Sequence, residues 1–339
     1  MAAGAGGHDG IGPVEQEAAH GVACSMLSAA AAAAAAAHAP HALREVPVLG
    51  PGAHVAMVSP SGPLNGPHEL ERAVATAESL GWTVSVGTHA LARTGYFAGD
   101  DAQRGDDLLT AMQDPRVDGI WCIRGGYGAA RLLPRVQQAL PDMSPKALIG
   151  YSDITALHAA WQRAGLISYH GPTARSPLSG FSRASLVEVV QQRTPVLWRA
   201  TGASVVRGGT ASGRLAGGNL ALVASLCGTP WACDFRDAIV VLEDINEATY
   251  RIDRMLTQLR LAGAFDGCRG LAIGHFTDCP ATIEDGRRTV VALIEELAAA
   301  LQVPTLLGVP IGHIEEQWTV PLGAWATLDA DARMLQLHR

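Results

Sequence analysis

The chain has 339 residues and a net charge of −7, with 17% charged residues and 38 glycines. This length allows one large or two modest domains with a sizeable core, and the composition is typical of an α/β protein with buried parallel strands. The acidic balance and the lack of a basic run argue against a nucleic-acid partner. No stretch of about 18 residues has the apolar composition of a membrane span.

Residues 1–45 are rich in glycine and alanine, with nine consecutive alanines from Ala29 to Ala37. A secretory signal has a basic region before its apolar run, whereas here acidic residues precede the run and the first basic residue is Arg44. The stretch "GVAC" resembles a lipoprotein cleavage site, but no hydrophobic segment leads into it. We predict a disordered low-complexity tail over 1–45, with Met26 as an alternative start.

Short apolar runs alternate with amphipathic segments from residue 53 onward. Strands are predicted within 54–62, 82–87, 118–126, 146–152 and 166–172, and helices within 66–81, 100–115, 127–136 and 153–165. This alternation predicts a parallel sheet with right-handed crossovers. It loosens after Ser182, where a last helix over 184–192 precedes short β segments over 193–210.

A second unit starts near Ala211. Strands are predicted at 238–244 and 270–278, helices at 249–263 and 283–301, and a β-rich end at 303–337. Helix 249–261 places Ile252, Met255, Leu256 and Leu259 on one face. We therefore expect an N-terminal domain over 46–182, a linker over 183–210 and a C-terminal domain over 211–339.

The six cysteines form no CxxC pair, their spacing fits no zinc-binding pattern, and no HExxH motif is present. No metal site and no cofactor are therefore expected. The cysteines are expected to be reduced, mostly buried thiols of a cytoplasmic protein.

Four glycine-marked turns follow predicted strands, and ligands of an open parallel sheet bind beyond the carboxyl ends of its strands. The turns are 59–62, 124–128, 150–153 and 170–172. We expect them to converge on one crevice.

Ser152 stands directly between a predicted strand and a predicted helix, as the serine of a nucleophile elbow does. The G-x-S-x-G pattern is incomplete, because Ile154 occupies the position of the second glycine. Serine is also a preferred helix cap, so an ordinary capping role is the alternative.

The loop from Arg124 to Gly128 could expose backbone N–H groups, as an oxyanion hole requires. It lacks the Lys-Ser/Thr of a P-loop and the spacing of a dinucleotide fingerprint. A simple tight turn is the alternative.

A carboxylate at the tip of a buried strand, such as Glu243, is well placed to orient an imidazole. Alternatively, Glu243 or Asp244 caps the helix beginning near Thr249. His313 follows an apolar run and a glycine and is one candidate base. His170, His275 and His158 compete for that role, and composition and spacing do not choose among them.

Together these segments resemble the murein LD-carboxypeptidase family, which also includes the microcin-immunity serine peptidases. The matching pieces run in family order from Val55 to Asp329 and are "VAMVSPSGP", "IRGGYGAARLL", "IGYSDITALHAAW", "HGP", "GRLAGGNLALVASLCGTPW", "VLEDINEATYRIDRMLTQLRLAG" and "VPIGHIEEQWTVPLGAWATLD". The resemblance implies an N-terminal parallel-sheet domain similar to class I glutamine amidotransferases and a smaller C-terminal β/α domain. It also implies a homodimer.

The resemblance further implies a catalytic triad of Ser152 as nucleophile, His313 as base and Glu243 as acid. Backbone N–H groups of Asp153 and of Gly125 and Gly126 would form the oxyanion hole. The site would lie between the two domains, which is a common place for a pocket.

The implied substrate is the cytosolic muropeptide tetrapeptide, which is cleaved between the L-centre of diaminopimelate and the terminal D-Ala in peptidoglycan recycling. Arg124 and the N–H groups of the Ser59–Gly62 turn are candidates for binding the terminal carboxylate, although Arg124 could instead pair with a structural carboxylate. Ser61, Tyr127 and His170 are further candidate substrate contacts.

Two other functions remain open from the sequence. The first is hydrolysis of an aminoacyl or peptidyl adenylate analogue, as in microcin immunity, with Trp318 stacking on the adenine unless it packs in the core. The second is a muropeptide-binding protein without catalysis. An enzyme that uses a dinucleotide is more distant, because no fingerprint glycine pattern opens the first helix.

Overall fold

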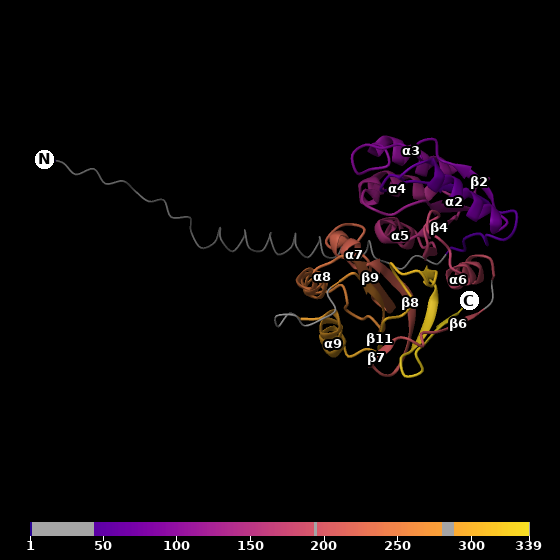
Figure 1. Ribbon diagram of the computed structural model, residues 1–339. Helices are drawn as coiled ribbons and strands as arrows, with labels where there is room; N and C mark the ends of the chain where they lie inside the picture. The colour runs from indigo at the N-terminus through magenta and orange to yellow at the C-terminus, as the bar shows by residue number, and fades with distance from the viewer. Residues whose placement is uncertain (2–43, 193–194, 280–287, 339) are drawn as a thin grey trace. The chain divides into compact units, whose positions relative to one another are not determined.

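The computed structural model describes Met1 and residues 44–192, 195–279 and 288–338 (Figure 1). The described residues from Arg44 onward belong to one compact unit. Most of the predicted tail 1–45 and the first part of the helix predicted over 283–301 lie outside the described residues.

Strands and helices alternate through the first half of the folded chain, as predicted. The strands are β1 (His54–Val58), β2 (Thr83–Val86), β3 (Gly119–Cys122), β4 (Ala147–Gly150) and β5 (Ser168–His170). The helices are α2 (Pro67–Ser79), α3 (Asp101–Gln113), α4 (Leu133–Ala139), α5 (Thr155–Arg163) and α6 (Gly180–Val190). Three 3-10 turns, η1 (Ala129–Leu132), η2 (Leu140–Asp142) and η3 (Ser152–Ile154), lie before or after α4 and α5.

Local sequence signals explain where these helices begin. α2 starts at Pro67, whose missing N–H costs nothing in the first turn. α3 has a capping box in which Asp100 and Gln103 satisfy each other's backbone N–H groups. α6 begins at Gly180, four residues before the predicted start, because the side chain of Ser179 caps it by accepting from Ser182 N–H.

The first sheet has the order β12-β5-β4-β3-β1-β2. β1 to β5 are parallel to their neighbours, as predicted. The outer strand β12 (Val320–Leu322) comes from the C-terminal end of the chain and runs antiparallel to β5. β12 belongs to the predicted C-terminal domain over 211–339, yet it pairs with a strand of the predicted N-terminal domain over 46–182.

The second half of the chain builds an eight-stranded sheet with the order β6-β14-β13-β8-β9-β10-β11-β7. Its strands are β6 (Val196–Arg199), β7 (Ser204–Arg207), β8 (Thr210–Asn219), β9 (Ala238–Ile245), β10 (Gly270–Thr277), β11 (Thr305–Leu307), β13 (Trp325–Asp329) and β14 (Met334–Leu337). β8 to β11 are parallel and the outer strands are antiparallel.

The helices of this half are α7 (Leu220–Leu226), α8 (Thr249–Leu261) and α9 (Val290–Leu301). They gather on one side of β9 (Figure 1), where Val240 and Leu242 pack in the same apolar cluster as buried residues of α7, α8 and α9. Ile239 and Val241 belong instead to the core cluster that contains the first sheet. This alternation follows from the period of two in a strand and decides which way the end of β9 faces.

The predicted α/β class is confirmed by these two sheets and their helices. Met255 of α8 is half-buried, whereas its predicted partners on that face are buried. Within the described ranges, no helix is both long and apolar enough to cross a membrane. The five cysteines in those ranges are free thiols, and Cys24 lies outside them.

Candidate active site

Backbone and side-chain contacts bring the four predicted turns together at the carboxyl edge of the first sheet. Gly62 N–H donates to the carbonyl of Gly125 at 3.1 Å. A serine hydroxyl of the first turn donates to the Asp153 carboxylate, and Gly171 N–H donates to the carbonyl of Gly150 at 3.1 Å. The prediction that these turns converge is therefore confirmed.

Ser152 has a φ of +64°, in the left-handed region that non-glycine residues rarely adopt. A tight turn of this kind presents a hydroxyl at the edge of the sheet, as in a nucleophile elbow. The hydroxyl does not cap the following helix, because the N-cap of α5 is Ile154 and makes no side-chain cap bond. In the described part of the chain this hydroxyl has no hydrogen-bond partner, His313 included.

Gly125 passes directly over this serine. A Cβ atom at Gly125 would lie 3.0 Å from Ser152 Cβ and 3.2 Å from Ser152 Oγ. Gly126 has a φ of +121°, which also favours glycine. A glycine at position 125 lets the loop approach the hydroxyl this closely, whereas a Cβ at Gly126 would meet Gly62 at 3.1 Å. Backbone N–H groups of such a loop are the kind of donor that stabilises a developing oxyanion.

Glu243 faces this edge because of its position in β9. It continues the alternate series of Ile239 and Val241, whose side chains face the first half of the chain. Asp244 faces the other way and accepts the N–H of a residue in the first turn of α7 at 2.9 Å. Neither carboxylate caps α8, whose N-cap has no side-chain bond, so the capping alternative does not hold.

The fully buried carboxylate of Glu243 accepts a hydrogen bond from His313, with 2.8 Å between Nδ1 and Oε2. Gly312 makes this approach possible, since a Cβ at that position would lie 2.7 Å from the same carboxylate oxygen. With Nδ1 committed to the carboxylate, Nε2 of the imidazole remains available for proton transfer. The ring packs against Tyr151, the residue before Ser152, with 4.7 Å between ring centroids.

The loop that carries His313 is held from both halves of the chain. Thr277 of β10 donates its hydroxyl to the carbonyl of His313 at 3.0 Å. Ser182 of α6 donates to the carbonyl of Glu315 at 2.7 Å and accepts from Gln317 N–H at 2.9 Å. These bonds fix the backbone on both sides of the imidazole.

The structure also separates the four candidate histidines. His313 is the one whose ring nitrogen hydrogen-bonds Glu243. His170 is fully buried behind Glu243, with its Nε2 at 4.0 Å from Oε1, too far for a hydrogen bond. His158 bonds the carbonyl of Gly150 at 2.8 Å, and burial lowers its pKa to about 4. His275 is exposed on β10.

The predicted substrate contacts differ in how accessible they are. Ser61 is buried and donates its hydroxyl to Asp153 at 2.6 Å, so this hydroxyl is not exposed for contact with a substrate. Trp318 is buried and its ring stacks on Trp198 with 4.8 Å between centroids, so it packs in the core. Tyr127 is exposed, and the half-buried Arg124 donates to the carbonyl of Pro63.

Sequence reasoning did not single out Arg175. Its guanidinium pairs with Glu69 at 3.0 Å while remaining one-third exposed. Burial lowers the pKa of Arg124, and the positive charges of Arg175 and Arg93 lower it further. Arg93, Arg124 and Arg175 thus lie close enough to interact electrostatically, together with Glu69. Arg175 directly follows "HGPTA", so its position three residues after the predicted 170–172 turn was the available signal.

These groups can perform acyl transfer. The site combines a free hydroxyl on a strained turn, an imidazole oriented by a buried carboxylate and a glycine loop beside the hydroxyl. Within the described ranges, no group of three or more His, Cys, Asp or Glu side chains could hold a metal ion.

Two family models match the chain. Residues 55–171 match the LD-carboxypeptidase N-terminal domain, and residues 212–328 match the LD-carboxypeptidase C-terminal domain. A relative from Synechocystis sp. is 39% identical over 292 residues, which covers 85% of this chain and 95% of the relative. Murein tetrapeptide carboxypeptidase from Pseudomonas aeruginosa is 34% identical over 294 residues, covering 82% of this chain and 93% of that protein.

Solved structures share the fold. Muramoyltetrapeptide carboxypeptidase from Oxalobacter formigenes superposes with a TM-score of 0.74 and 30% identity, covering 84% of this chain and 97% of that chain. The microcin C7 self-immunity protein in complex with aspartyl sulfamoyl adenosine superposes with a TM-score of 0.78 and 23% identity, covering 87% and 98%. The latter likeness concerns the fold alone.

Proposed function

The chain belongs to the LD-carboxypeptidase family, and we propose that it is a serine carboxypeptidase that releases the terminal D-Ala of muropeptide tetrapeptides. The hydrogen bond between His313 and the buried Glu243 carries the proposal, and the imidazole packs on Tyr151, the residue before Ser152. A serine hydroxyl is a weak nucleophile until a base removes its proton, and this pair supplies an oriented base.

In the proposed reaction, Ser152 Oγ attacks the carbonyl carbon of the scissile bond while His313 Nε2 takes the hydroxyl proton. The imidazolium then gives that proton to the amine of the departing D-Ala, and an acyl-enzyme remains. Water, deprotonated by the same imidazole, hydrolyses the ester and restores Ser152. Glu243 holds the tautomer and stabilises the imidazolium in both steps.

The negative charge of the tetrahedral intermediate needs donors that are already in place. We assign this role to the N–H groups of Gly125, Gly126 and Asp153. The position of Gly125 supports the assignment, since a Cβ added there would lie 3.2 Å from Ser152 Oγ. Removing one donor in such sites costs about 3–4 kcal/mol of transition-state stabilisation.

A carboxypeptidase must also recognise the free carboxylate of its substrate. We place this carboxylate against Arg124 and Arg175. Arg124 begins the glycine loop and its guanidinium lies against the 59–62 turn, since its guanidinium carbon is 3.6 Å from where a Cβ of Gly62 would stand. The crowding of cations around Glu69 favours an additional anion, and guanidinium groups bind carboxylates with good geometry. Tyr127 remains a proposed rim contact.

Several finer expectations remain part of this proposal. They are action in the cytosol during peptidoglycan recycling, assembly as a homodimer, and a likeness of the N-terminal half to class I glutamine amidotransferases. Light scattering on the purified chain measures the oligomeric state directly.

Hydrolysis of adenylate analogues receives less support from the site. The aromatic residue expected to stack on the adenine, Trp318, is buried against Trp198. A binding protein without catalysis would have no need for an imidazole oriented by a buried carboxylate. Labelling of Ser152 by a serine-reactive phosphonate separates that alternative from an enzyme.

The decisive experiment is mass spectrometry of the full chain incubated with the muropeptide tetrapeptide. We expect loss of one D-Ala per peptide with the wild-type protein and none with Ser152→Ala. Absence of D-Ala release by folded wild-type protein that still reacts with the phosphonate refutes the substrate. Activity of Ser152→Ala at the wild-type rate refutes the mechanism.

A further inference from the structure

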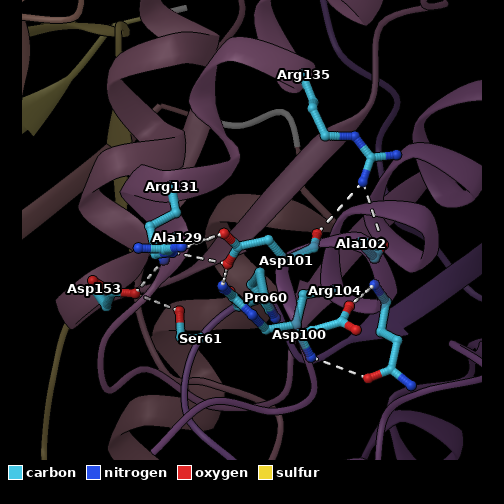
Figure 2. Close-up of polar contacts among 11 residues, drawn as sticks. Pro60, Ser61, Asp100, Asp101, Ala102, Arg104, Ala129, Arg131, Arg135 and Asp153 are labelled. Atoms are coloured by element: carbon cyan, nitrogen blue, oxygen red, sulfur yellow. Dashed lines mark hydrogen bonds and ion pairs between the residues drawn. The ribbon is translucent and has the colours of Figure 1, made fainter. Parts of the chain in front are cut away.

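The carboxylate of Asp153 is fully buried directly after Ser152. Its Oδ2 accepts the hydroxyl of Ser61 at 2.6 Å and the N–H of Ala129 at 2.8 Å. Figure 2 shows this oxygen between the two donors. Ser61 belongs to the turn after β1, and Ala129 follows the glycine loop. One oxygen atom therefore joins two turns that lie next to the serine.

These bonds anchor the glycine loop at its far end. Its near end is already held, because the carbonyl of Gly125 accepts Gly62 N–H. Asp153 holds the other end at Ala129 and also the turn that contains Gly62, through Ser61. The distance between the glycine loop and Ser152 thus depends on the side chain of Asp153, the next residue in the chain.

Keeping a charge at this position is expensive for the fold. Burial raises the pKa of the Asp153 carboxyl, and its bonds to Ser61 and Ala129 only partly offset this effect. The positive charge of Arg104 also lowers the pKa of Asp153, but the Arg104 guanidinium donates its hydrogen bonds to the carbonyl of Pro60 and the carboxylate of Asp101 (Figure 2). A costly buried charge that touches the loop beside the nucleophile suggests a role in activity.

We propose that Asp153 is a positioning residue whose carboxylate holds the glycine loop at the distance from Ser152 that aligns the oxyanion donors. This inference rests on the proposed serine-peptidase function and adds a role for the side chain of Asp153 to that of its N–H. Ser61 assists by holding the same oxygen.

The test compares Asp153→Ala, Asp153→Asn and Ser61→Ala in the full chain. Asp153→Ala removes both bonds, whereas asparagine keeps an acceptor oxygen, and Ser61→Ala leaves the bond from Ala129. A displacement of about 1 Å in such a site lowers the rate about 100-fold. We expect kcat on the tetrapeptide to fall about 100-fold in Asp153→Ala and about tenfold or less in the other two, with KM within about twofold of wild type.

Two further measurements separate positioning from simple loss of structure. Thermal unfolding at pH 8 checks folding, and we expect the Asp153→Asn midpoint to equal or exceed that of wild type because a buried charge is removed. The second-order rate of phosphonate labelling reports the alignment around Ser152 without the peptide. We expect it to fall in the same order as kcat.

The proposal is overturned if Asp153→Ala keeps the wild-type labelling rate, or if Asp153→Asn is no better than Asp153→Ala. Should the wild type label with phosphonate but leave the tetrapeptide intact, the substrate of the proposed function is wrong. The labelling rates then still decide the role of Asp153.

Discussion

Gly312→Ala tests the contact between His313 and Glu243 without altering either residue. The new Cβ would lie 2.7 Å from Glu243 Oε2 and 2.9 Å from Glu243 Cβ. The carboxylate oxygen must retreat by about 0.7 Å to regain ordinary van der Waals contact, which lengthens its 2.8 Å bond to about 3.5 Å and breaks it. In addition, the φ of +112° at this position costs a residue with a Cβ about 1–3 kcal/mol.

We expect kcat to fall about 100-fold in Gly312→Ala, as a displacement of this size does in a positioned site. KM should change little, because the substrate does not contact Gly312 in the proposed mechanism. Steady-state kinetics of D-Ala release measures both constants, and urea unfolding measures the loss of stability. Gly202→Ala is the matched control, since its Cβ would meet no atom within 4 Å. Wild-type kcat in a folded Gly312→Ala protein would falsify the requirement for the His313–Glu243 contact.

Two more variants test the surroundings of the site. The pKa of His158 is lowered to about 4 in the folded protein, so the unfolded chain takes up this proton first as the pH falls from 7 to 4. The free energy of unfolding therefore falls by about 3 kcal/mol over this range because of His158. His158→Gln should remove most of that loss relative to wild type in urea unfolding at the two pH values; an equal loss in both proteins contradicts the assignment. Arg175→Met should raise KM for the tetrapeptide about tenfold or more, whereas the exposed Arg116→Met should not, and an unchanged KM in Arg175→Met rules out carboxylate binding by this residue.

Much of the first half could be predicted because its signals are local. Pro67 marks the start of α2 and Gly81 its end, and the alternation of strands and helices predicts parallel pairing. β12 lies in the β-rich end predicted over 303–337, but its place in the first sheet could not be predicted, since nothing within three residues says which sheet they will join. Its pairing with β5 is a contact between segments about 150 residues apart in the chain.

The candidate site also combines residues that local sequence signals indicate with contacts that only the fold reveals. The position of Ser152 between strand and helix and that of Glu243 at a strand tip are visible in the sequence. Only the family resemblance pointed to the pairing of Glu243 with His313, because four histidines fit the local pattern equally well. The side-chain role of Asp153 is hidden from the sequence for a similar reason: its partners Ser61 and Ala129 are 92 and 24 residues away.

The strand β12 begins seven residues after His313 and completes the first sheet beside β5. During synthesis the serine, its turn and the glycine loop emerge from the ribosome long before this strand does. On the proposed mechanism, the nascent chain therefore carries a serine without its base until the segment from His313 to β12 has folded back onto the first sheet. On the proposed mechanism, hydrolysis would begin only after this segment has folded, and a truncated chain that ends before β12 would lack the outer strand of the first sheet beside β5.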